Sequence, residues 1–164
     1  MSASNDSAEF SLRMDDVISG EFGSYVVKQL KGEGTYARVA RCVDLSTRQD
    51  VAVKISKLQF SSAAEREARV LQKLSSVSRT KNVVRFVSSF HYLEHHCLVL
   101  EHLDQSLYDF ICDRSFQPLL VPEIRYIAEQ LLAAFEELAR LKIAHCDLKP
   151  DNVMLVITNW NRSE

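Results

Sequence analysis

Residues 145–152 read His-Cys-Asp-Leu-Lys-Pro-Asp-Asn, and they lie between a predicted long helix and the apolar run at 153–157. A polar turn that contains a proline explains this composition, but it does not explain the order of the residues. In this order Asp147 can accept the proton of a hydroxyl group, and Asn152 can hold a magnesium ion, with Lys149 between them. The stretch therefore predicts a catalytic loop.

A glycine-rich hairpin is predicted far upstream, where residues 32–39 read Gly-Glu-Gly-Thr-Tyr-Ala-Arg-Val. Glycines let a backbone approach phosphate oxygens closely, with amide groups turned toward them. Taken alone, two glycines in a hairpin usually mark only a turn, and the third glycine of the usual pattern is replaced by Ala37. A Walker-type P-loop is excluded because no Gly-Lys-Ser/Thr follows.

A lysine, Lys54, stands inside an apolar strand that reads Val-Ala-Val-Lys at 51–54. A lysine in this setting must either reach water at a face of the sheet or meet an anion. A solvated lysine at a sheet edge is the plain alternative. The helix predicted next along the chain supplies a carboxylate, Glu67, on its inward side. Glu65 competes for the same role, but its neighbours fit the solvent face better.

Hydrophobic periodicity predicts five strands with one helix inserted among them, followed by further helices. Consecutive short strands with short connections favour an antiparallel meander. Pro122 suits the first turn of the last helix, whose apolar stripe runs from Ile124 to Leu141. The order predicts an α+β fold. The predicted strands are 25–30, 39–43, 51–55, 83–90 and 97–100, and the predicted helices are 63–74, 106–114 and 122–141.

Composition and charge exclude several classes of protein. Of 164 residues, 46% are hydrophobic and 26% are charged, so an ordinary globular core can form. A net charge of -2 provides no broad basic face for a nucleic-acid backbone, and we expect no nucleic-acid partner. There is no apolar run of membrane-spanning length and no signal-peptide pattern, so we expect no membrane association. Residues 1–20 are rich in Ser, Asp and Asn and predict a flexible leader.

Cysteines and histidines do not form a recognisable metal pattern. The four cysteines are widely spaced and contain no Cys-x-x-Cys pair, which favours reduced thiols over disulfides or zinc. Four of the five histidines cluster around the last two predicted strands, where their neighbours favour a polar hairpin over a metal site. These four are His91, His95, His96 and His102.

The hairpin, the strand lysine, the helix glutamate and the polar loop follow one another in the order found in eukaryotic protein kinases, and the chain resembles that family over about 25–157. More narrowly, it resembles the homeodomain-interacting protein kinases and their dual-specificity tyrosine-regulated relatives. That group often lacks the arginine of the usual His-Arg-Asp, as here, where Cys146 takes its place. Three stretches carry the narrower resemblance: Cys-Leu-Val-Leu-Glu at 97–101, Asp-Gln-Ser-Leu-Tyr-Asp-Phe at 104–110 and Ala-His-Cys-Asp-Leu-Lys-Pro at 144–150.

The resemblance implies a kinase-like division of the chain and a role for each matching residue. Residues 21–103 would form the N-lobe and hinge, and 104–164 the start of an incomplete C-lobe with the catalytic loop. Asp147 would be the catalytic base, Lys149 a γ-phosphate contact and Asn152 the Mg²⁺ ligand. The implied ATP contacts are Lys54 at the α- and β-phosphates, paired with Glu67; Gly32, Glu33 and Gly34 over the phosphates; Val39 and Ala52 above adenine; Leu100 as gatekeeper; Glu101 and Leu103 as backbone partners of the adenine edge; and Met154 beneath the base.

The chain departs from the family pattern after residue 156. Kinases have an Asp-Phe-Gly motif here, whose aspartate is the main magnesium ligand. In this chain, residues 157–164 read Ile-Thr-Asn-Trp-Asn-Arg-Ser-Glu instead. We therefore expect little or no turnover from this chain. The predicted helix at 122–141 normally packs on later helices, so part of its apolar stripe should be exposed. Leaving even ~400 Å² uncovered forfeits on the order of 10 kcal/mol, so we expect a protein partner on that surface.

Two functions remain open on these observations. The first is an ATP-dependent protein serine/threonine kinase domain, with dual specificity open, which transfers phosphate from Mg-ATP to protein hydroxyl groups. Lys149, two residues after the aspartate, resembles the serine/threonine kinases rather than the tyrosine kinases. The second is a noncatalytic, pseudokinase-like module that binds nucleotide or a partner. The resemblance implies a nuclear or cytoplasmic protein, and no basic cluster in the sequence serves as a nuclear localisation signal.

Overall fold

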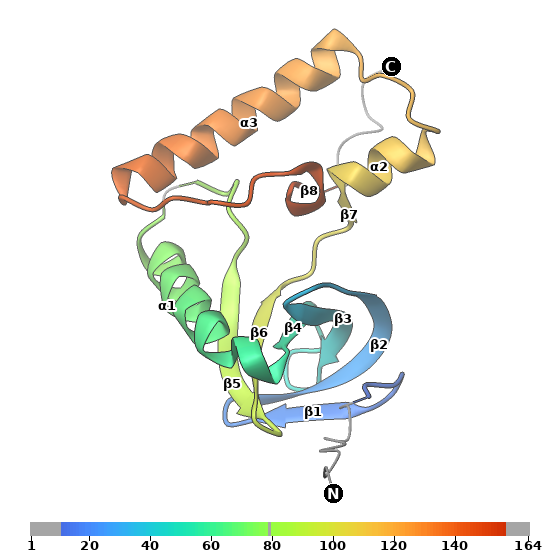
Figure 1. Ribbon diagram of the computed structural model, residues 1–164, viewed down its shortest axis with the longest axis vertical. Helices are drawn as coiled ribbons and strands as arrows, with labels where there is room; N and C mark the ends of the chain where they lie inside the picture. Colours follow the sequence, from blue (N-terminus) through green and yellow to red (C-terminus); the bar gives the residue numbers. More distant parts are fainter. Residues whose placement is uncertain (1–10, 79, 157–164) are drawn as a thin grey trace, which may run out of the picture. The chain divides into compact units, whose positions relative to one another are not determined.

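A six-stranded sheet in the order β1-β2-β3-β4-β6-β5 is the main feature of the computed structural model, which describes residues 11–78 and 80–156 (Figure 1). The four strands from β1 to β4 pair with their neighbours in antiparallel fashion. The strands are β1 Val17–Gly20, β2 Gly23–Glu33, β3 Ala37–Asp44, β4 Asp50–Ser56, β5 Phe86–Tyr92 and β6 His95–Glu101. The α+β class predicted above is confirmed, but the predicted count of five strands in the sheet is wrong.

The additional strand, β1, lies inside the stretch that the sequence assigns to a flexible leader. Ile18 is fully buried in this strand, and Val17 pairs with Val26 of β2. The strand has only four residues, so its periodicity is too short to detect, and pairing with β2 is what makes it a strand. Residues 1–10 lie outside the described part of the chain.

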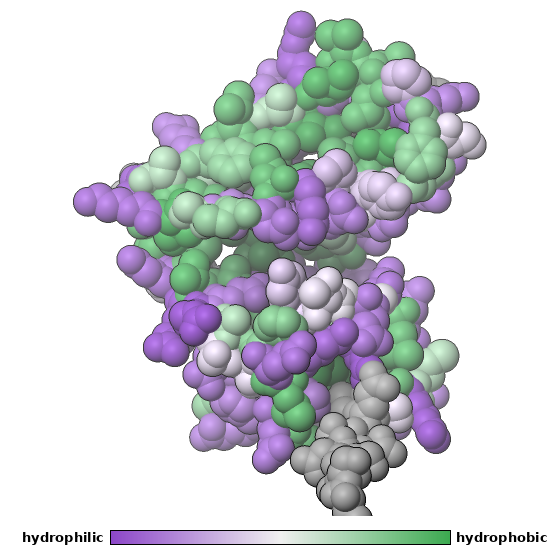
Figure 2. All heavy atoms as spheres, in the orientation of Figure 1, coloured by the Kyte–Doolittle hydropathy of each residue, from purple (hydrophilic) through white to green (hydrophobic). Residues whose placement is uncertain are grey.

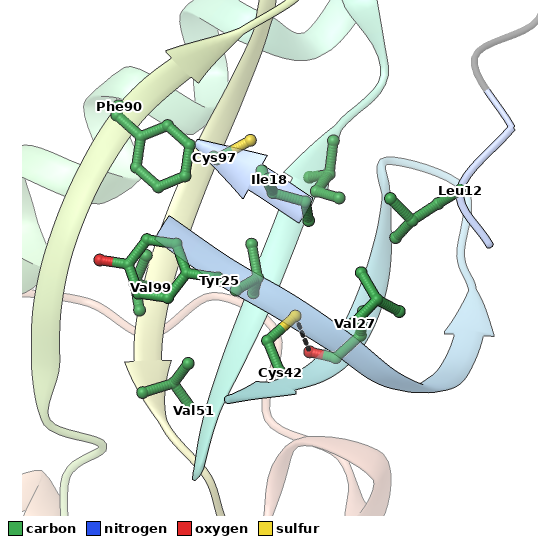
Figure 3. Packing of buried hydrophobic residues seen from close by; sticks show 12 residues of the cluster. Leu12, Ile18, Tyr25, Val27, Cys42, Val51, Phe90, Cys97 and Val99 are labelled. Carbon is green, nitrogen blue, oxygen red and sulfur yellow. Dashed lines mark hydrogen bonds between the residues drawn. The ribbon is translucent and has the colours of Figure 1, made fainter. Parts of the chain in front are cut away.

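The described residues fall into two compact units, the first running to Arg66 and including 88–99, the second comprising 67–87 and everything from Leu100 onward. The first unit has a core in which the rings of Tyr25 and Phe90 stack with centroids 5.6 Å apart (Figure 3). A Cβ atom added to Gly20 would stand 2.2 Å from Cγ of Phe90, so only glycine fits there. The core residues are Leu12, Ile18, Tyr25, Val27, Ala40, Cys42, Val51, Val53, Ile55, Phe90, Cys97 and Val99.

Two of the four cysteines belong to this core, and all four are free thiols. Burial raises the pKa of Cys42 and of Cys97 to about 12. Both thiols therefore stay protonated at neutral pH and act as small apolar side chains.

The turn between β3 and β4 is organised by a buried carboxylate, Asp44. Its Oδ1 accepts the Ser46 N–H (2.8 Å), the Ser46 hydroxyl (2.7 Å) and the Thr47 N–H (3.3 Å). Burial alone would raise the pKa of Asp44, but the bonds from Ser46 and Thr47 outweigh it and lower the pKa below its ordinary value. The ionised carboxylate is therefore part of the folded turn.

Replacing Asp44 with Ala should lower the free energy of unfolding by about 1–2 kcal/mol at pH 7, because three donors lose their acceptor. A lowered pKa in the folded state means that this stabilisation is complete above the unfolded value of about 3.9 and is lost as the pH falls through the folded value. Urea unfolding of both proteins between pH 3 and pH 7 measures the difference. A difference that grows on acidification would contradict this assignment.

The second unit contains most of helix α1 (Ser61–Val77) and the two helices that follow the sheet. Helix α1 begins in the first unit and ends here, and it is followed along the chain by α2 (Leu107–Asp113) and α3 (Val121–Arg140). Ser106 caps α2 by accepting the Asp109 N–H at 3.0 Å. The two short strands β7 (Gln105–Ser106) and β8 (Met154–Leu155) pair with each other, and the 3₁₀ turn Pro150–Asn152 precedes β8.

The end of α1 and the loop that follows it are tied to α3 by side-chain bonds to backbone carbonyls. Arg140 donates to the carbonyl of Val77 (3.2 Å) and forms two bonds with Glu137 of its own helix (2.8 and 2.7 Å). Asn82 donates to the carbonyl of Gln130 at 3.2 Å. These contacts hold the second unit together around α3.

The apolar stripe of α3 is buried toward its C-terminal end and open toward its start. Ala134 and Leu138 are buried, whereas Ile124 is 50% exposed and Leu132 is 69% exposed. Apolar side chains also gather along α3 on the face drawn in Figure 2. No helix among the described residues is both long enough and apolar enough to cross a membrane.

Candidate functional site

The glycine-rich hairpin joins β2 to β3, and its two glycines are not required by the fold. No glycine of the chain has a positive φ, and a Cβ atom added to Gly32 would meet no atom within 4 Å. At Gly34 the added Cβ would make only an ordinary contact, 3.5 Å from the carbonyl oxygen of Ala37. Their missing side chains therefore leave an open backbone that a phosphate group can approach.

The side chain of Glu33 braces this hairpin. Its carboxylate lies 3.1 Å from the Arg38 guanidinium and 3.1 Å from Nζ of Lys57, and these two cations, Arg38 first, lower the pKa of Glu33. The hairpin tip is also held by the Lys57 N–H, which donates to the carbonyl of Tyr36 (2.9 Å), and by an edge-to-face contact between Tyr36 and Phe60 (4.9 Å). The side chain of Glu33 is thus engaged with its neighbours, and its backbone is the part that can face phosphates.

This brace was not predicted from the sequence. Lys57 and Phe60 follow β4 as a single residue and a short 3₁₀ turn, and nothing local marks them as partners of the hairpin. Only the pairing of β3 with β4 brings them beside Tyr36, because Ala37 lies opposite Ser56 in that register.

Val39, Ala52 and Lys54 share one face of the sheet. Val39 lies opposite Lys54 in the β3–β4 register, and all three side chains are half-buried. The alternate residues of β4, among them Val51 and Val53, point into the core on the other face. The period of two along β4 therefore directs Ala52 and Lys54 away from the core.

The two candidate carboxylates on α1 differ in their surroundings. Glu65 lies 3.3 Å from Nε2 of His91, a partner within its own unit. Glu67 is half-buried and begins the second unit. The pairing of Glu67 with Lys54 stays a prediction.

Leu100, Glu101 and Leu103 are half-buried, the first two at the end of β6 and the third just beyond it. The N–H of Glu101 donates to the carbonyl of Arg85 at 3.0 Å. This bond leaves the carbonyl oxygen as the backbone group of Glu101 that can accept a bond from a base.

The polar loop brings three of the predicted catalytic side chains together. Oδ2 of Asp147 accepts a hydrogen bond from Nδ2 of Asn152 at 2.8 Å and lies 3.3 Å from Nζ of Lys149. The same amide nitrogen of Asn152 donates to the Asp147 carbonyl, also at 2.8 Å. Hydrogen bonds from Lys149, and next from Asn152, lower the pKa of Asp147, which is therefore ionised at neutral pH.

The residues before Asp147 set the course of its backbone. The Asp147 N–H donates to Nδ1 of His145 at 3.3 Å, and Cys146 between them has a left-handed backbone with φ 63°. Backbone positions of this kind concentrate at functional sites. Within the described residues, both bonds to the Asp147 side chain use Oδ2. Oδ1 is therefore the oxygen that can accept a hydrogen bond from a hydroxyl group.

The surroundings of Asn152 and Met154 bear on the metal and nucleotide predictions. Nδ2 of Asn152 makes two bonds to Asp147, which leaves its Oδ1 as a ligand atom for a hard cation. Met154 is 41% exposed in β8. Among residues 11–78 and 80–156, no three His, Cys, Asp or Glu side chains gather in a way that could hold a metal ion.

The histidines near the last two strands make other contacts. His95 Nδ1 lies 2.7 Å from the carbonyl of Ser56, and the rings of His91 and His96 meet edge to face at 4.9 Å. These contacts fit the prediction of a polar hairpin.

Comparison with known proteins finds a matching family and several relatives. The protein kinase domain family matches residues 25–161. Homeodomain-interacting protein kinase 1 of Mus musculus is 38% identical over 151 residues, which is 90% of this chain and 12% of that protein. Dual specificity tyrosine-phosphorylation-regulated kinase 3 of Macaca fascicularis is 36% identical over 135 residues, 80% of this chain and 24% of that protein.

The fold also matches a solved structure. A crystal structure of a kinase domain superimposes with a TM-score of 0.81 at 28% identity, and the match covers 89% of this chain and 43% of that one. The chain thus spans a small part of the curated relatives it matches and under half of the matched structure. On the match over residues 25–161, this chain belongs to the protein kinase domain family.

Proposed function

We propose that this chain contributes the nucleotide site and the catalytic loop of an ATP-dependent protein serine/threonine kinase. The observation that carries the proposal is the loop around Asp147, where Lys149 and Asn152 both engage Oδ2 of the carboxylate. A polar turn explains the composition of this loop, but it does not explain why a lysine and an amide both contact one carboxylate oxygen.

The chemistry follows from these contacts. A serine or threonine hydroxyl would donate to Oδ1 of Asp147, which orients the hydroxyl oxygen toward the γ-phosphate. Asp147 would accept the proton as the new oxygen–phosphorus bond forms and the bond from the γ-phosphorus to the bridging oxygen breaks, so that ADP leaves. Lys149, 3.3 Å from Oδ2, brings a positive charge beside the group that transfers. The lowered pKa of Asp147 keeps the acceptor ionised at neutral pH.

The nucleotide would be held by the residues that match the kinase pattern. In this proposal Gly32 and Gly34 cover the phosphates with their backbone, Lys54 binds the α- and β-phosphates, and Glu67 orients that lysine. The remaining proposed contacts are Val39, Ala52, Leu100, Glu101, Leu103 and Met154 around the adenine.

A magnesium ion would be held by Oδ1 of Asn152 together with the phosphate oxygens of the nucleotide, since this ion is commonly bound by few protein oxygens and by substrate phosphates. When bound, it neutralises charge that develops on the phosphates. The described residues supply this one amide oxygen, oriented by the bonds from Nδ2 to Asp147.

The exposed start of the α3 stripe is where we expect a protein partner, or further kinase chain, to pack. Nuclear or cytoplasmic residence is proposed from the likeness to the homeodomain-interacting kinases.

Thermal unfolding of the full chain with ATP and Mg²⁺ tests the nucleotide site. ATP at ~100 times its dissociation constant should stabilise the wild type by about 2.7 kcal/mol. The same titration of Lys54→Ala should give a much smaller shift. Lys28→Ala is the matched control, because Lys28 lies in the same sheet and pairs with Asp15 at the surface (2.8 Å). Equal shifts for all three proteins would contradict the proposed site.

A further inference from the structure

The tip of the glycine-rich hairpin is held by contacts from two directions. Across the hairpin, Glu33 lies directly opposite Arg38 in the β2–β3 register, and their charged groups are 3.1 Å apart. From the segment after β4, Nζ of Lys57 reaches the same carboxylate at 3.1 Å, and the Lys57 N–H donates to the carbonyl of Tyr36 at 2.9 Å. All four residues belong to the first unit, so these contacts lie within one compact part of the chain.

The backbone between these contacts has few neighbours among the described residues. A Cβ atom added to Gly32 would meet no atom within 4 Å, and one added to Gly34 would stand 3.5 Å from the carbonyl oxygen of Ala37. The Gly34 N–H closes the turn by donating to that carbonyl at 2.9 Å. Glycine loses more conformational freedom on ordering than any other residue, so a segment with two glycines depends on its neighbours for a fixed course.

We propose that Arg38 and Lys57 are positioning residues, which hold Glu33 from two sides and so keep the backbone of 32–34 in the course that receives the nucleotide phosphates. The inference rests on the proposed nucleotide site and adds two residues that set its affinity without touching the nucleotide. A hairpin that is competent for only a fraction of the time binds the phosphates more weakly by that fraction. Arg38, Lys57 and Glu33 are called the hairpin cluster below.

Surface ion pairs often contribute little to stability, and the side chains of the hairpin cluster are 21% exposed at Arg38, 37% at Lys57 and 46% at Glu33. Two features distinguish this cluster from a solvated pair. One carboxylate is shared by two cations, and the backbone bond from Lys57 to Tyr36 fixes the point from which the lysine side chain starts. We therefore expect the cluster to affect the hairpin far more than the stability of the whole unit.

A direct role of the two cations predicts the opposite sign for one substitution. If Arg38 and Lys57 neutralised the phosphates themselves, Glu33 would compete for them, and Glu33→Gln would strengthen ATP binding. If they act through Glu33, the same substitution loosens the hairpin and weakens ATP binding. Glutamine has the size of glutamate without its charge, so this variant tests the ion pairs and leaves the shape of the side chain unchanged.

The experiment compares ATP with adenosine, which lacks the phosphates. Isothermal titration calorimetry of the full chain with Mg²⁺ gives both dissociation constants. Glu33→Gln should weaken ATP about tenfold and leave adenosine within about twofold, as expected if the loosened hairpin is competent about a tenth of the time. Lys57→Met and Arg38→Gln should each weaken ATP about threefold, because the other cation still holds Glu33.

Matched variants separate this role from a loss of charge or of stability. The double variant Glu33→Arg with Arg38→Glu keeps the cross-strand pair with its direction reversed, so it should bind ATP within about threefold of the wild type. Glu21→Gln makes the same chemical change at an exposed residue between β1 and β2 and should change neither constant. Asp44→Ala should lower the melting temperature of the same unit without changing the ratio of the two constants.

The outcomes distinguish this inference from the proposed function. A wild type that binds neither ATP nor adenosine overturns both. A wild type that binds ATP, with a Glu33→Gln variant that binds it equally well or more tightly, overturns the inference and leaves the nucleotide site in place. Equal weakening of ATP and adenosine in Glu33→Gln, or no recovery in the double variant, also overturns it, because the effect would then not pass from the ion pairs to the phosphates.

Discussion

Asp147→Asn should reduce the weak phosphate transfer expected of this chain, from ATP to a protein substrate, by about 10²–10⁴-fold, the usual contribution of a positioned proton acceptor. An amide cannot take the hydroxyl proton, and it removes the negative charge beside Lys149. Transfer of labelled γ-phosphate to a generic serine- and threonine-rich protein measures the rate. The melting shift with Mg-ATP should remain, since Asp147 does not bind the nucleotide in this proposal.

Asp151→Asn is the matched control for this experiment. It makes the same chemical change four residues later, in the 3₁₀ turn Pro150–Asn152, where the side chain is exposed. We expect its transfer rate to stay within about twofold of the wild type. Equal losses in the two variants would contradict the role of Asp147. Transfer by the wild type that is lost in Asp147→Asn would rule out the noncatalytic, pseudokinase-like alternative.

Ile18→Ala should lower the free energy of unfolding by about 2–5 kcal/mol, a large part of the stability of a typical domain. Ile18 has no exposed surface and lies among core residues contributed by other strands of the sheet (Figure 3). Truncation of the Ile18 side chain would leave a cavity in the hydrophobic core. It would also remove a core contact of β1, a strand of only four residues. Urea or thermal unfolding of the full chain measures the change.

Val17→Ala provides the control on the adjacent residue. Val17 is 47% exposed and points to the opposite side of β1, so its truncation should cost under about 1 kcal/mol. Similar small effects of both substitutions would mean that residues 17–20 act as a leader, as the composition of 1–20 suggests. A large effect of Ile18→Ala alone would establish β1 as part of the core in solution.

Elements with a long or distinctive local pattern were predicted well. Helix α3 was expected at 122–141 and spans Val121–Arg140, because its apolar stripe repeats over more than four turns and a proline marks its start. Strand β4 was expected at 51–55 and spans Asp50–Ser56, since buried and half-buried residues alternate along it. In both elements the local pattern agrees with the packing.

Strand β5 shows where local pattern and packing diverge. It was expected at 83–90 and spans Phe86–Tyr92. Its start is set by the bond from the Phe86 amide to Ser75, and its end by the turn at Leu93 and Glu94, where both residues have positive φ. That turn normally uses Asn or Gly, so the sequence carries no turn signal there.

By itself, the sequence determined the α+β class, the kinase family and the identity of the loop residues Asp147, Lys149 and Asn152. These follow from the order of residue types within short stretches, and local order is what a sequence displays directly. Tertiary structure alone decided that β1 is a sixth strand, that Lys57 braces the hairpin, and that the carboxylate of Glu101 accepts the Arg85 amide. Each of these depends on contacts between separate elements, and such contacts form only when strand register and packing bring the elements together.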